Sequence, residues 1–189
     1  MNILFVNAAQ PSQAEAEVLY EWLGASFPDS PRLLRADVRK KNILPCTACM
    51  SCQMKTPGIC VRQDDMRELL PVYIQSDIVV YLTPLFCGGY CSELKKFIDR
   101  LCPVLTACFE KRNDETWHIP RYEKRPAVIG IGLADGSRSS EKIFNTLFSR
   151  NMKQLHILEH SCLLLPRGKS HEELRAVFRH SFQEAGIAL

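Results

Sequence analysis

Residues 77–83 read DIVVYLT, an apolar run without a charge after its first residue. A strand of this composition is typical of a parallel sheet that helices cover on both faces. The residues that follow repeat apolar side chains at the spacing of one helix face: Leu94, Phe97, Ile98, Leu101 and Leu105. This stretch therefore predicts a buried strand that leads into an amphipathic helix.

The rest of the chain repeats this alternation of short apolar runs with amphipathic stretches. We expect further strands at residues 2–7, 32–36, 127–133 and 156–165. About five β/α alternations predict an open parallel sheet flanked by helices. At 189 residues the chain is too short for a TIM barrel, which needs about 250. We therefore expect an α/β flavodoxin-like three-layer sandwich, in which a five-stranded parallel sheet of order 2-1-3-4-5 carries helices on both faces.

Length and composition indicate one globular domain over residues 1–189, since a domain takes roughly 150 residues. Apolar residues make up 46% of the chain, which excludes intrinsic disorder. The 24 Lys and Arg against 21 Asp and Glu give a net charge of +3, too weak a balance for tracking nucleic-acid phosphates. The sequence shows neither a basic n-region nor an apolar run of the roughly 20 residues that cross a bilayer. We therefore expect a cytoplasmic protein with no nucleic-acid and no membrane partner.

Two segments, residues 37–63 and 108–125, are longer than their connecting role requires. Loops of this size within a compact domain are usually functional. In open α/β sheets the ligand binds beyond the carboxyl ends of the strands. We therefore expect one site, bounded by NAAQPSQ at 7–13, TPLFCGGYC at 83–91 and LADGS at 133–137.

Nine cysteines are many for a chain without a secretory signal. A reducing compartment and an odd count both argue against a disulfide framework. Four of the cysteines form the pattern Cys46-x2-Cys49-x2-Cys52-x7-Cys60. Thiolates at this spacing can surround one [4Fe–4S] cluster. The spacing leaves two alternatives open, because zinc accepts the same ligands and because free or redox-active thiols can occupy such a turn.

The other five cysteines are scattered along the chain. Cys87 and Cys91 follow the DIVVYLT strand, where we expect the rim of the site. Cys102, Cys108 and Cys162 stand among apolar residues, so we expect them in the core.

The segment 83–92 ends a strand and opens a helix. Pro84 has no N–H to donate to a neighbouring strand, and Gly88 and Gly89 allow the backbone to approach a flat ligand. Phe86 adds an aromatic face. The local chemistry alone is equally compatible with a plain strand-to-helix turn.

Residues 77–101, DIVVYLTPLFCGGYCSELKKFIDRL, resemble the family of NAD(P)H-dependent FMN reductases. In that family a strand ends in Ser/Thr-Pro-x-Tyr/Phe, and the next helix carries Leu-Lys-x-Phe-Ile-Asp-Arg, which is present here at 94–100. Residues 46–66 resemble the cysteine-bearing loop of the iron-sulfur flavoprotein branch. The stretch His118-Ile-Pro-Arg121-Tyr122 is similar to one in related flavodoxin-like members.

The resemblance implies a flavodoxin-like fold, FMN as cofactor, NAD(P)H as co-substrate, and a homodimer or homotetramer. By position, it implies that the isoalloxazine ring is lined by Pro84, Leu85, Phe86, Cys87 and Gly88. It likewise implies a [4Fe–4S] cluster on the four cysteines of the pattern above, Cys46, Cys49, Cys52 and Cys60.

The first loop, residues 7–15, departs from the family pattern. The family wraps the FMN phosphate in a loop rich in Gly, Ser, Arg and Thr at a helix N-terminus. Here the loop reads NAAQPSQAE, lacks glycine and arginine, and brings Glu15 and Glu17 close to the expected phosphate. The side chains that could donate to the phosphate are Asn7, Gln10, Ser12 and Gln13. We assign Gln10 and Ser12 to the cofactor.

The loop after the fourth strand, residues 134–140, is the third expected wall of the site. We assign Asp135 and Gly136 to the cofactor, and Arg138 could meet a nucleotide phosphate. A serine of this loop could instead cap the helix that follows.

The leading interpretation is an FMN-dependent NAD(P)H oxidoreductase that passes electrons from a nicotinamide through the flavin to a small acceptor or an Fe–S centre. The cofactor carries this chemistry, so no acid or base is required and we assign no catalytic residue. The electron acceptor would be a small molecule or a redox protein. Two alternatives are an iron-sulfur and flavin electron-transfer protein without a dedicated substrate, and a non-enzymatic flavodoxin-fold module with a degenerate phosphate loop.

Overall fold

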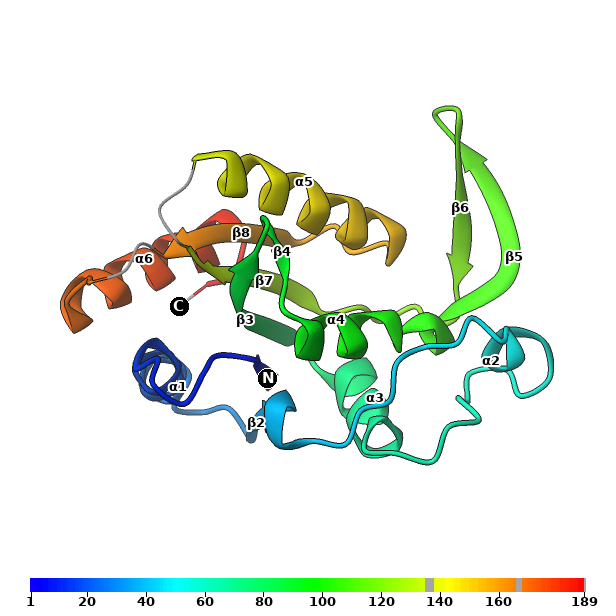
Figure 1. The fold of residues 1–189 in the computed structure, drawn as a ribbon, viewed down its shortest axis with the longest axis horizontal. Coiled ribbons are helices and arrows are strands. Elements are labelled where there is room, and N and C mark those ends of the chain that lie inside the picture. The colour runs from blue at the N-terminus through cyan, green and yellow to red at the C-terminus, as the bar shows by residue number, and fades with distance from the viewer. Residues whose placement is uncertain (135–137, 166–167, 189) are drawn as a thin grey trace.

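A computed structural model describes residues 1–134, 138–165 and 168–188 (Figure 1). Its main sheet contains five parallel strands: β1 (Asn2–Asn7), β2 (Arg32–Asp37), β3 (Ile78–Phe86), β7 (Ala127–Leu133) and β8 (His160–Leu165). They lie in the order β2-β1-β3-β7-β8, so β7 and β8 occupy the fourth and fifth places. The predicted flavodoxin-like order 2-1-3-4-5 is confirmed. A sixth strand, the short β4 (Gly89–Tyr90), pairs antiparallel with the end of β3.

Helices cover both faces of the sheet, because alternate side chains of each strand point to opposite faces. On one face, α1 (Glu15–Ser26) and α6 (His171–Glu184) share an apolar core with the strands. On the other face, a second core includes α3 (Met66–Gln75), α4 (Ser92–Asp99) and α5 (Arg138–Gln154). The three expected layers are therefore present (Figure 1).

Glycines in β7 allow α5 to lie close to the sheet. At Gly130 an added Cβ would stand 2.3 Å from Cε2 of the buried Phe148. Gly132 is similarly restricted, since a Cβ there would stand 2.6 Å from Cδ2 of Leu164. The two glycines of β7 therefore allow the side chains of Phe148 and Leu164 to pack directly on the strand backbone.

The helix predicted through residue 105 ends earlier than the apolar spacing indicates. α4 ends at Asp99, and a 3-10 turn over Cys102–Val104 follows it, with Pro103 in the turn. Proline has no N–H for a helical hydrogen bond and disfavours helix interiors. Leu105 therefore begins a strand, and the prediction that it extends the helical face is wrong.

Most of the long connection 108–125 is an antiparallel hairpin of β5 (Leu105–Arg112) and β6 (Glu115–Pro120). It extends away from the sheet near the end of α5 (Figure 1). At its base, Arg121 Nε donates to a backbone carbonyl at 3.0 Å. Near its tip, Glu115 forms ion pairs of 2.7 and 2.6 Å with two basic residues of α5, Arg150 and Lys153.

The segment between β2 and α3 carries the cysteine pattern in an extended loop. It contains a 3-10 turn over Val38–Lys40 and the short helix α2 (Ser51–Met54), which lies beside the start of β5 (Figure 1). Sequence reasoning did not predict α3, which contains Pro71 in its interior. In the part of the chain that the structure describes, the helices are all too short or too polar to cross a membrane.

Candidate functional site

The loops that follow β1 and β3 meet at one edge of the sheet. The Ala8 amide donates to the Leu82 carbonyl at 2.8 Å, and the Cys91 thiol donates to the Ala8 carbonyl at 3.8 Å. The Cys91 amide donates to the Thr83 hydroxyl at 3.2 Å. These bonds hold the first loop against the segment after β3, at the edge where open α/β sheets bind their ligands.

A cleft of about 420 Å³ opens beside the first loop. One wall comes from this loop and the start of α1, including Gln10 and Ala14. The opposite wall comes from the end of β2 and the turn after it: Arg35, Asp37, Arg39 and Lys40. Ligand pockets in proteins range from about 300 to 1,000 Å³, so this cleft has room for part of a nucleotide.

Sequence reasoning missed the basic side chains of this cleft, because they lie about 30 residues from the first loop and only the β1–β2 pairing brings them together. Arg39 donates through Nε to the Ala8 carbonyl at 2.8 Å, and its Nη1 lies 3.5 Å from the Glu93 carboxylate. The Lys40 side chain is largely exposed, with a carboxylate of Asp37 3.8 Å away. Both residues retain N–H groups of the kind that bind a phosphate.

Arg35 also neutralises the negative charge of two carboxylates at the cleft, Glu17 and Asp37. Arg35 lies 2.7 Å from the Glu17 carboxylate and 2.8 Å from that of Asp37, and its guanidinium stacks over Phe5 and Tyr20. The hydrogen bond from Arg35 lowers the pKa of Glu17, so this carboxylate is ionised and paired. Glu17 is therefore a partner of Arg35 rather than an uncompensated charge beside a phosphate.

Two of the four side chains expected to donate to a phosphate already make other hydrogen bonds. Asn7 Nδ2 donates to Asp37 at 2.7 Å, and Asn7 Oδ1 accepts a loop amide at 3.0 Å. The Gln13 side chain accepts the Gln10 amide at 2.6 Å. Gln10 lines the cleft and Ser12 is exposed beside it, so these two assignments remain predictions.

The residues predicted to line the isoalloxazine form the end of β3 and its turn into β4: Pro84, Leu85, Phe86, Cys87 and Gly88. Pro84 is buried, whereas Phe86 is 62% exposed. Cys87 and Gly88 both have positive φ, 50° and 74°, which makes the turn tight. A Cβ at Gly88 would stand 2.7 Å from Cβ of Ile143, so the turn packs on α5 and presents Phe86 outward.

The third expected wall cannot be placed. Asp135 and Gly136, predicted to contact the cofactor, lie outside the described residues. Ala134, just before them, is buried and its amide donates to the Leu165 carbonyl at 3.1 Å. The chain therefore leaves β7 at the same edge of the sheet as the first loop.

The four cysteines of the pattern line one cavity of about 120 Å³: Cys46, Cys49, Cys52 and Cys60. The backbone turns sharply between them, with Ala48 at φ 51° and Met50 at φ 57°. As placed, no three His, Cys, Asp or Glu side chains of the described residues stand close enough together to hold a metal ion. The donor set suits a cluster or zinc, and binding would draw the thiols inward from the cavity wall.

The surroundings of these thiols shift the pKa values of Cys52 and Cys49 in opposite directions. Burial raises the pKa of Cys52, and the neighbouring Cys60, Cys46 and Cys49 raise it further. At Cys49, hydrogen bonds from the Ser51 amide and hydroxyl lower the pKa. Because metals bind thiolates, repulsion of this kind is relieved when a cation or cluster enters.

The core prediction for three cysteines is only partly right, because of the three only Cys162 packs against the apolar core. Cys108 is exposed on the hairpin, and Cys162 is half-buried on β8. Cys102 lines the cavity of the four-cysteine pattern, and burial raises the pKa of its thiol to about 11. Cys102 was missed as a site residue because Pro103 redirects the chain after α4. Cys87 is exposed and Cys91 is buried in the segment after β3, where the rim was expected.

A buried ion pair closes the base of the cysteine loop. Arg100 Nη1 and Nη2 donate to the two carboxylate oxygens of Asp64 at 2.6 and 3.0 Å, and Nη1 also donates to the Leu44 carbonyl at 2.7 Å. Asp64 in turn accepts the Leu44 amide at 2.9 Å. Burial would raise the pKa of Asp64, but the bonds from Arg100 and from backbone amides outweigh it and lower the pKa. The residues on both sides of the cysteine pattern are thus tied to α4.

A further hollow of about 380 Å³ adjoins the cysteine cavity and shares part of its wall, including Cys46, Cys102 and His118. His118 Nδ1 bonds the Thr106 carbonyl at 2.8 Å, and its ring stacks on Phe109. Nδ1 is the donor of this bond, because a carbonyl oxygen can only accept.

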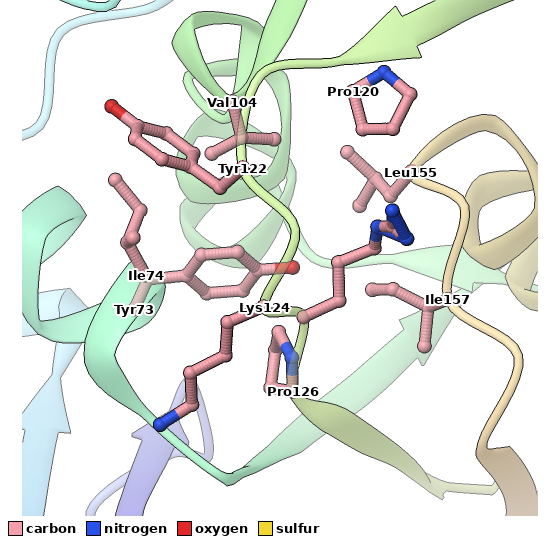
Figure 2. A pocket seen from close by; sticks show the side chains of 10 residues that line it. Tyr73, Ile74, Val104, Pro120, Tyr122, Lys124, Pro126, Leu155 and Ile157 are labelled. Atoms are coloured by element: carbon pink, nitrogen blue, oxygen red, sulfur yellow. The ribbon is translucent and has the colours of Figure 1, made fainter.

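A smaller pocket lies between α3, the base of the hairpin and the residues after α5 (Figure 2). Apolar and aromatic side chains surround it, including Tyr73, Val104 and Ile157. Its volume of about 20 Å³ is enough for about one water molecule. It is therefore a packing gap and not a ligand site.

The sheet order, the carboxyl-edge cleft and the tight turn after β3 are those of a flavodoxin-like fold. The family model described as NADPH-dependent FMN reductase matches residues 1–159. The chain belongs to this family, which confirms the predicted resemblance.

A curated relative is similar in sequence, and solved structures are similar in fold. An iron-sulfur flavoprotein from Archaeoglobus fulgidus is 36% identical over 117 residues, covering 54% of this chain and 52% of the relative. The chain thus spans about half the length of this curated relative. An FMN-dependent NADH-azoreductase from Bacillus anthracis, solved in complex with FMN, has a TM-score of 0.64 at 15% identity and 98% coverage of each chain. An NAD(P)H:quinone oxidoreductase from Methanothermobacter marburgensis has a TM-score of 0.64 at 12% identity, covering 98% of this chain and 96% of the other. At these identities the two structures confirm the fold.

Proposed function

We propose that this protein is an FMN-dependent NAD(P)H oxidoreductase that passes electrons from a nicotinamide through the flavin to a small acceptor. The observation that carries the proposal is the cleft at the end of β1, where Arg39 and Lys40 present free N–H groups beside the first loop. A dianionic phosphate needs such donors when its loop contains no arginine. Bound FMN would supply the chemistry, by accepting hydride and releasing electrons to the acceptor.

The residues around the cleft would bind and orient the cofactor. Arg39, Lys40 and Gln10 would hold the phosphate, with the amide groups that begin α1. Arg35 would keep its two carboxylate partners away from the phosphate. Phe86, exposed at the turn after β3, would cover one face of the isoalloxazine and exclude water from it.

Spectroscopy and turnover test this proposal together. The chain is purified without oxygen, titrated with FMN and followed by flavin absorbance and fluorescence. Oxidation of NADH and NADPH is then measured with a quinone or an azo dye as acceptor. Stoichiometric FMN and acceptor-dependent oxidation would support the proposal. A chain that neither retains nor takes up FMN overturns it and favours the non-enzymatic module.

The cysteine cavity supports a second redox centre in the same protein. We propose that Cys46, Cys49, Cys52 and Cys60 bind a [4Fe–4S] cluster, which would exchange electrons with the flavin or a redox partner. All four thiols line one cavity, and the chain is similar over 117 residues to a protein named an iron-sulfur flavoprotein. If the cluster alone is functional, the chain is an electron-transfer protein without a dedicated substrate.

Iron and sulfide analysis decides between cluster, zinc and free thiols. We expect about four irons per chain after anaerobic purification. Fewer than about two irons per chain would contradict the cluster assignment. One zinc per chain would show that the four cysteines form a zinc site instead. Cys52→Ser should abolish iron binding. Cys108→Ser is the matched control, because Cys108 is an exposed thiol on the hairpin, outside the cavity.

We further propose a cytoplasmic homodimer or homotetramer. The nine cysteines, which all fall in the described parts of the chain, are free thiols, and thiols stay reduced in the cytoplasm. Phe86 and Ile143 are exposed apolar side chains at the turn from β3 into β4. Neighbouring exposed apolar side chains mark a surface that a second copy of the chain can cover. Sedimentation of the native chain and of Ile143→Lys tests this, with a monomeric variant as the expected result. A monomeric native chain would contradict it.

A further inference from the structure

We propose that Arg100 is an outer-sphere ligand of the iron–sulfur cluster, donating a hydrogen bond from Nε–H to the sulfur of Cys60 and so raising the reduction potential of the cluster. The inference rests on the [4Fe–4S] cluster proposed above. It adds a positioning residue that lies outside the cysteine pattern, about 40 residues further along the chain on the C-cap of α4.

The guanidinium of Arg100 is buried, and its Nε is left without an acceptor. Its side chain is 2% exposed, and the carboxylate of its partner Asp64 is fully buried. Nη1 and Nη2 are bonded to Asp64 and to the Leu44 carbonyl. Among the described residues Nε has no hydrogen-bond partner, although it is inaccessible to solvent. Buried N–H groups nearly always have an acceptor, so a partner is missing at this position.

That missing partner lies toward the cysteines. Arg100 and Cys60 both line the cavity that the four thiols surround. Burial lowers the pKa of Arg100, but the Asp64 carboxylate and the nearby Cys60 thiol outweigh it and raise the pKa above its usual value. Asp64 binds both Nη atoms, so Nε is the guanidinium nitrogen left to serve the cavity that Arg100 shares with Cys60.

The other arginine of the cavity is less suited to this role. Arg62 belongs to the cysteine loop itself and lies between the exposed residues Val61 and Gln63. Its guanidinium can turn to water, whereas Arg100 is fixed by three bonds from two directions. A donor that has a fixed position and no contact with solvent forms a stronger hydrogen bond to a cluster sulfur than a donor that can turn to water.

The physical effect has a definite sign. Reduction adds one electron to the cluster, so the thiolate sulfurs become more negative and accept hydrogen bonds more strongly. A fixed N–H donor therefore stabilises the reduced cluster more than the oxidised one and raises the potential. If Arg100 only held the loop in place, its loss would admit water. Water also favours the more negative reduced cluster, so the potential would rise instead of falling.

The test compares native protein with Arg100→Lys, Asp64→Asn and Lys95→Gln. Arg100→Lys keeps the positive charge and the pairing with Asp64, but removes the Nε–H. Lys95→Gln is the matched control on α4, because Lys95 pairs with Asp99 at the surface. Iron and sulfide are counted, and the cluster is reduced stepwise with dithionite while its absorbance is followed against potential.

We expect Arg100→Lys to retain iron and to have a lower potential. We compare the two proteins at the potential where half of the native clusters are reduced. About one-tenth of the variant clusters should be reduced there, which corresponds to a potential lower by about 59 mV for a one-electron step. Asp64→Asn should shift the potential upward, since it removes an anion next to Arg100, and Lys95→Gln should leave it unchanged. An unchanged or higher potential in Arg100→Lys overturns the inference.

A second measurement covers the case in which Arg100→Lys loses its cluster. Protein with 15N in its arginine side chains is reduced, and the coupling of the cluster spin to 15N is measured in an Arg62→Lys background. A coupling from the remaining arginine supports the inference, and its absence overturns it. Native protein without iron also overturns the inference, while FMN binding and NAD(P)H oxidation report separately on the flavin function.

Discussion

Arg39 is the residue whose removal tests the cofactor cleft most directly. We predict that Arg39→Gln weakens FMN binding about tenfold. A hydrogen bond to a charged group contributes about 1.5–3 kcal/mol. The Arg39 side chain is 22% exposed, so water and salt screen it and the lower end of that range applies. About 1.5 kcal/mol corresponds to roughly a tenfold change in Kd.

The assay is a fluorescence titration of FMN at two salt concentrations. Arg39→Lys keeps the positive charge and should retain most of the affinity. Lys41→Gln is the control, because Lys41 is an exposed cation that follows the same turn but does not line the cleft. The difference between native and Arg39→Gln should shrink as salt increases.

Two results would refute this reasoning. An Arg39→Gln variant within twofold of the native affinity would show that Arg39 does not contact the phosphate. Equal losses in Arg39→Gln and Lys41→Gln would show that general positive charge, and not this geometry, determines binding. Because Arg39 also donates to the Ala8 carbonyl, thermal melting must show that the variant is folded.

Three further predictions concern stability. Asp64→Ala should lower the free energy of unfolding by about 3–5 kcal/mol in urea denaturation, because it leaves a buried guanidinium without its carboxylate. Gly130→Ala should cost about 1–3 kcal/mol, since the new Cβ would collide with Phe148, while Gly24→Ala, with its nearest neighbour atom at 3.9 Å, should be neutral or stabilising. The bonds from two basic residues of α5 lower the pKa of Glu115 from 4.5 to about 2, so its stabilising contribution is complete above about pH 4.5 and is lost as the pH falls toward 2. Melting temperatures of native protein and Glu115→Gln should therefore converge below pH 3.

Each of these has an outcome that contradicts it. An Asp64→Ala variant as stable as the native chain would mean that water reaches Arg100. Equal stability of the two glycine variants would place α5 further from β7 than the structure does. A constant difference between native protein and Glu115→Gln from pH 6 to pH 3 would mean that the hairpin is not held to α5 by this carboxylate.

Much of the fold follows from periodicity in the sequence. The strands at 2–7 and 127–133 have the predicted bounds, and DIVVYLT lies within β3. These runs are apolar on both faces. Both faces are buried when the strands lie in a parallel sheet that helices cover on each side. The errors arise where apolar spacing and backbone chemistry conflict. Leu105 fits the helical face of α4, but Pro103 ends the helical hydrogen bonding first.

The candidate site was predictable only where it is local in sequence. The four cysteines lie within 15 residues, so their spacing already indicated one centre, and the structure gathers them around one cavity. Cys102 and Arg100 reach that cavity from α4 and the turn that follows it. No spacing rule connects residues so far apart, because their proximity depends on how α4 packs on the sheet.

The sequence alone determined the apolar strand runs, the family and the cysteine pattern, because each depends on side chains close together along the chain. The tertiary structure alone decided how charge is arranged around the cleft and the cysteines. Pairing of β1 with β2 brings Arg35 and Arg39 to a first loop that has no arginine of its own. Packing of α4 places Arg100 between Asp64 and Cys60. Coulomb and hydrogen-bond energies depend on distances in space, which the order of residues along the chain does not specify.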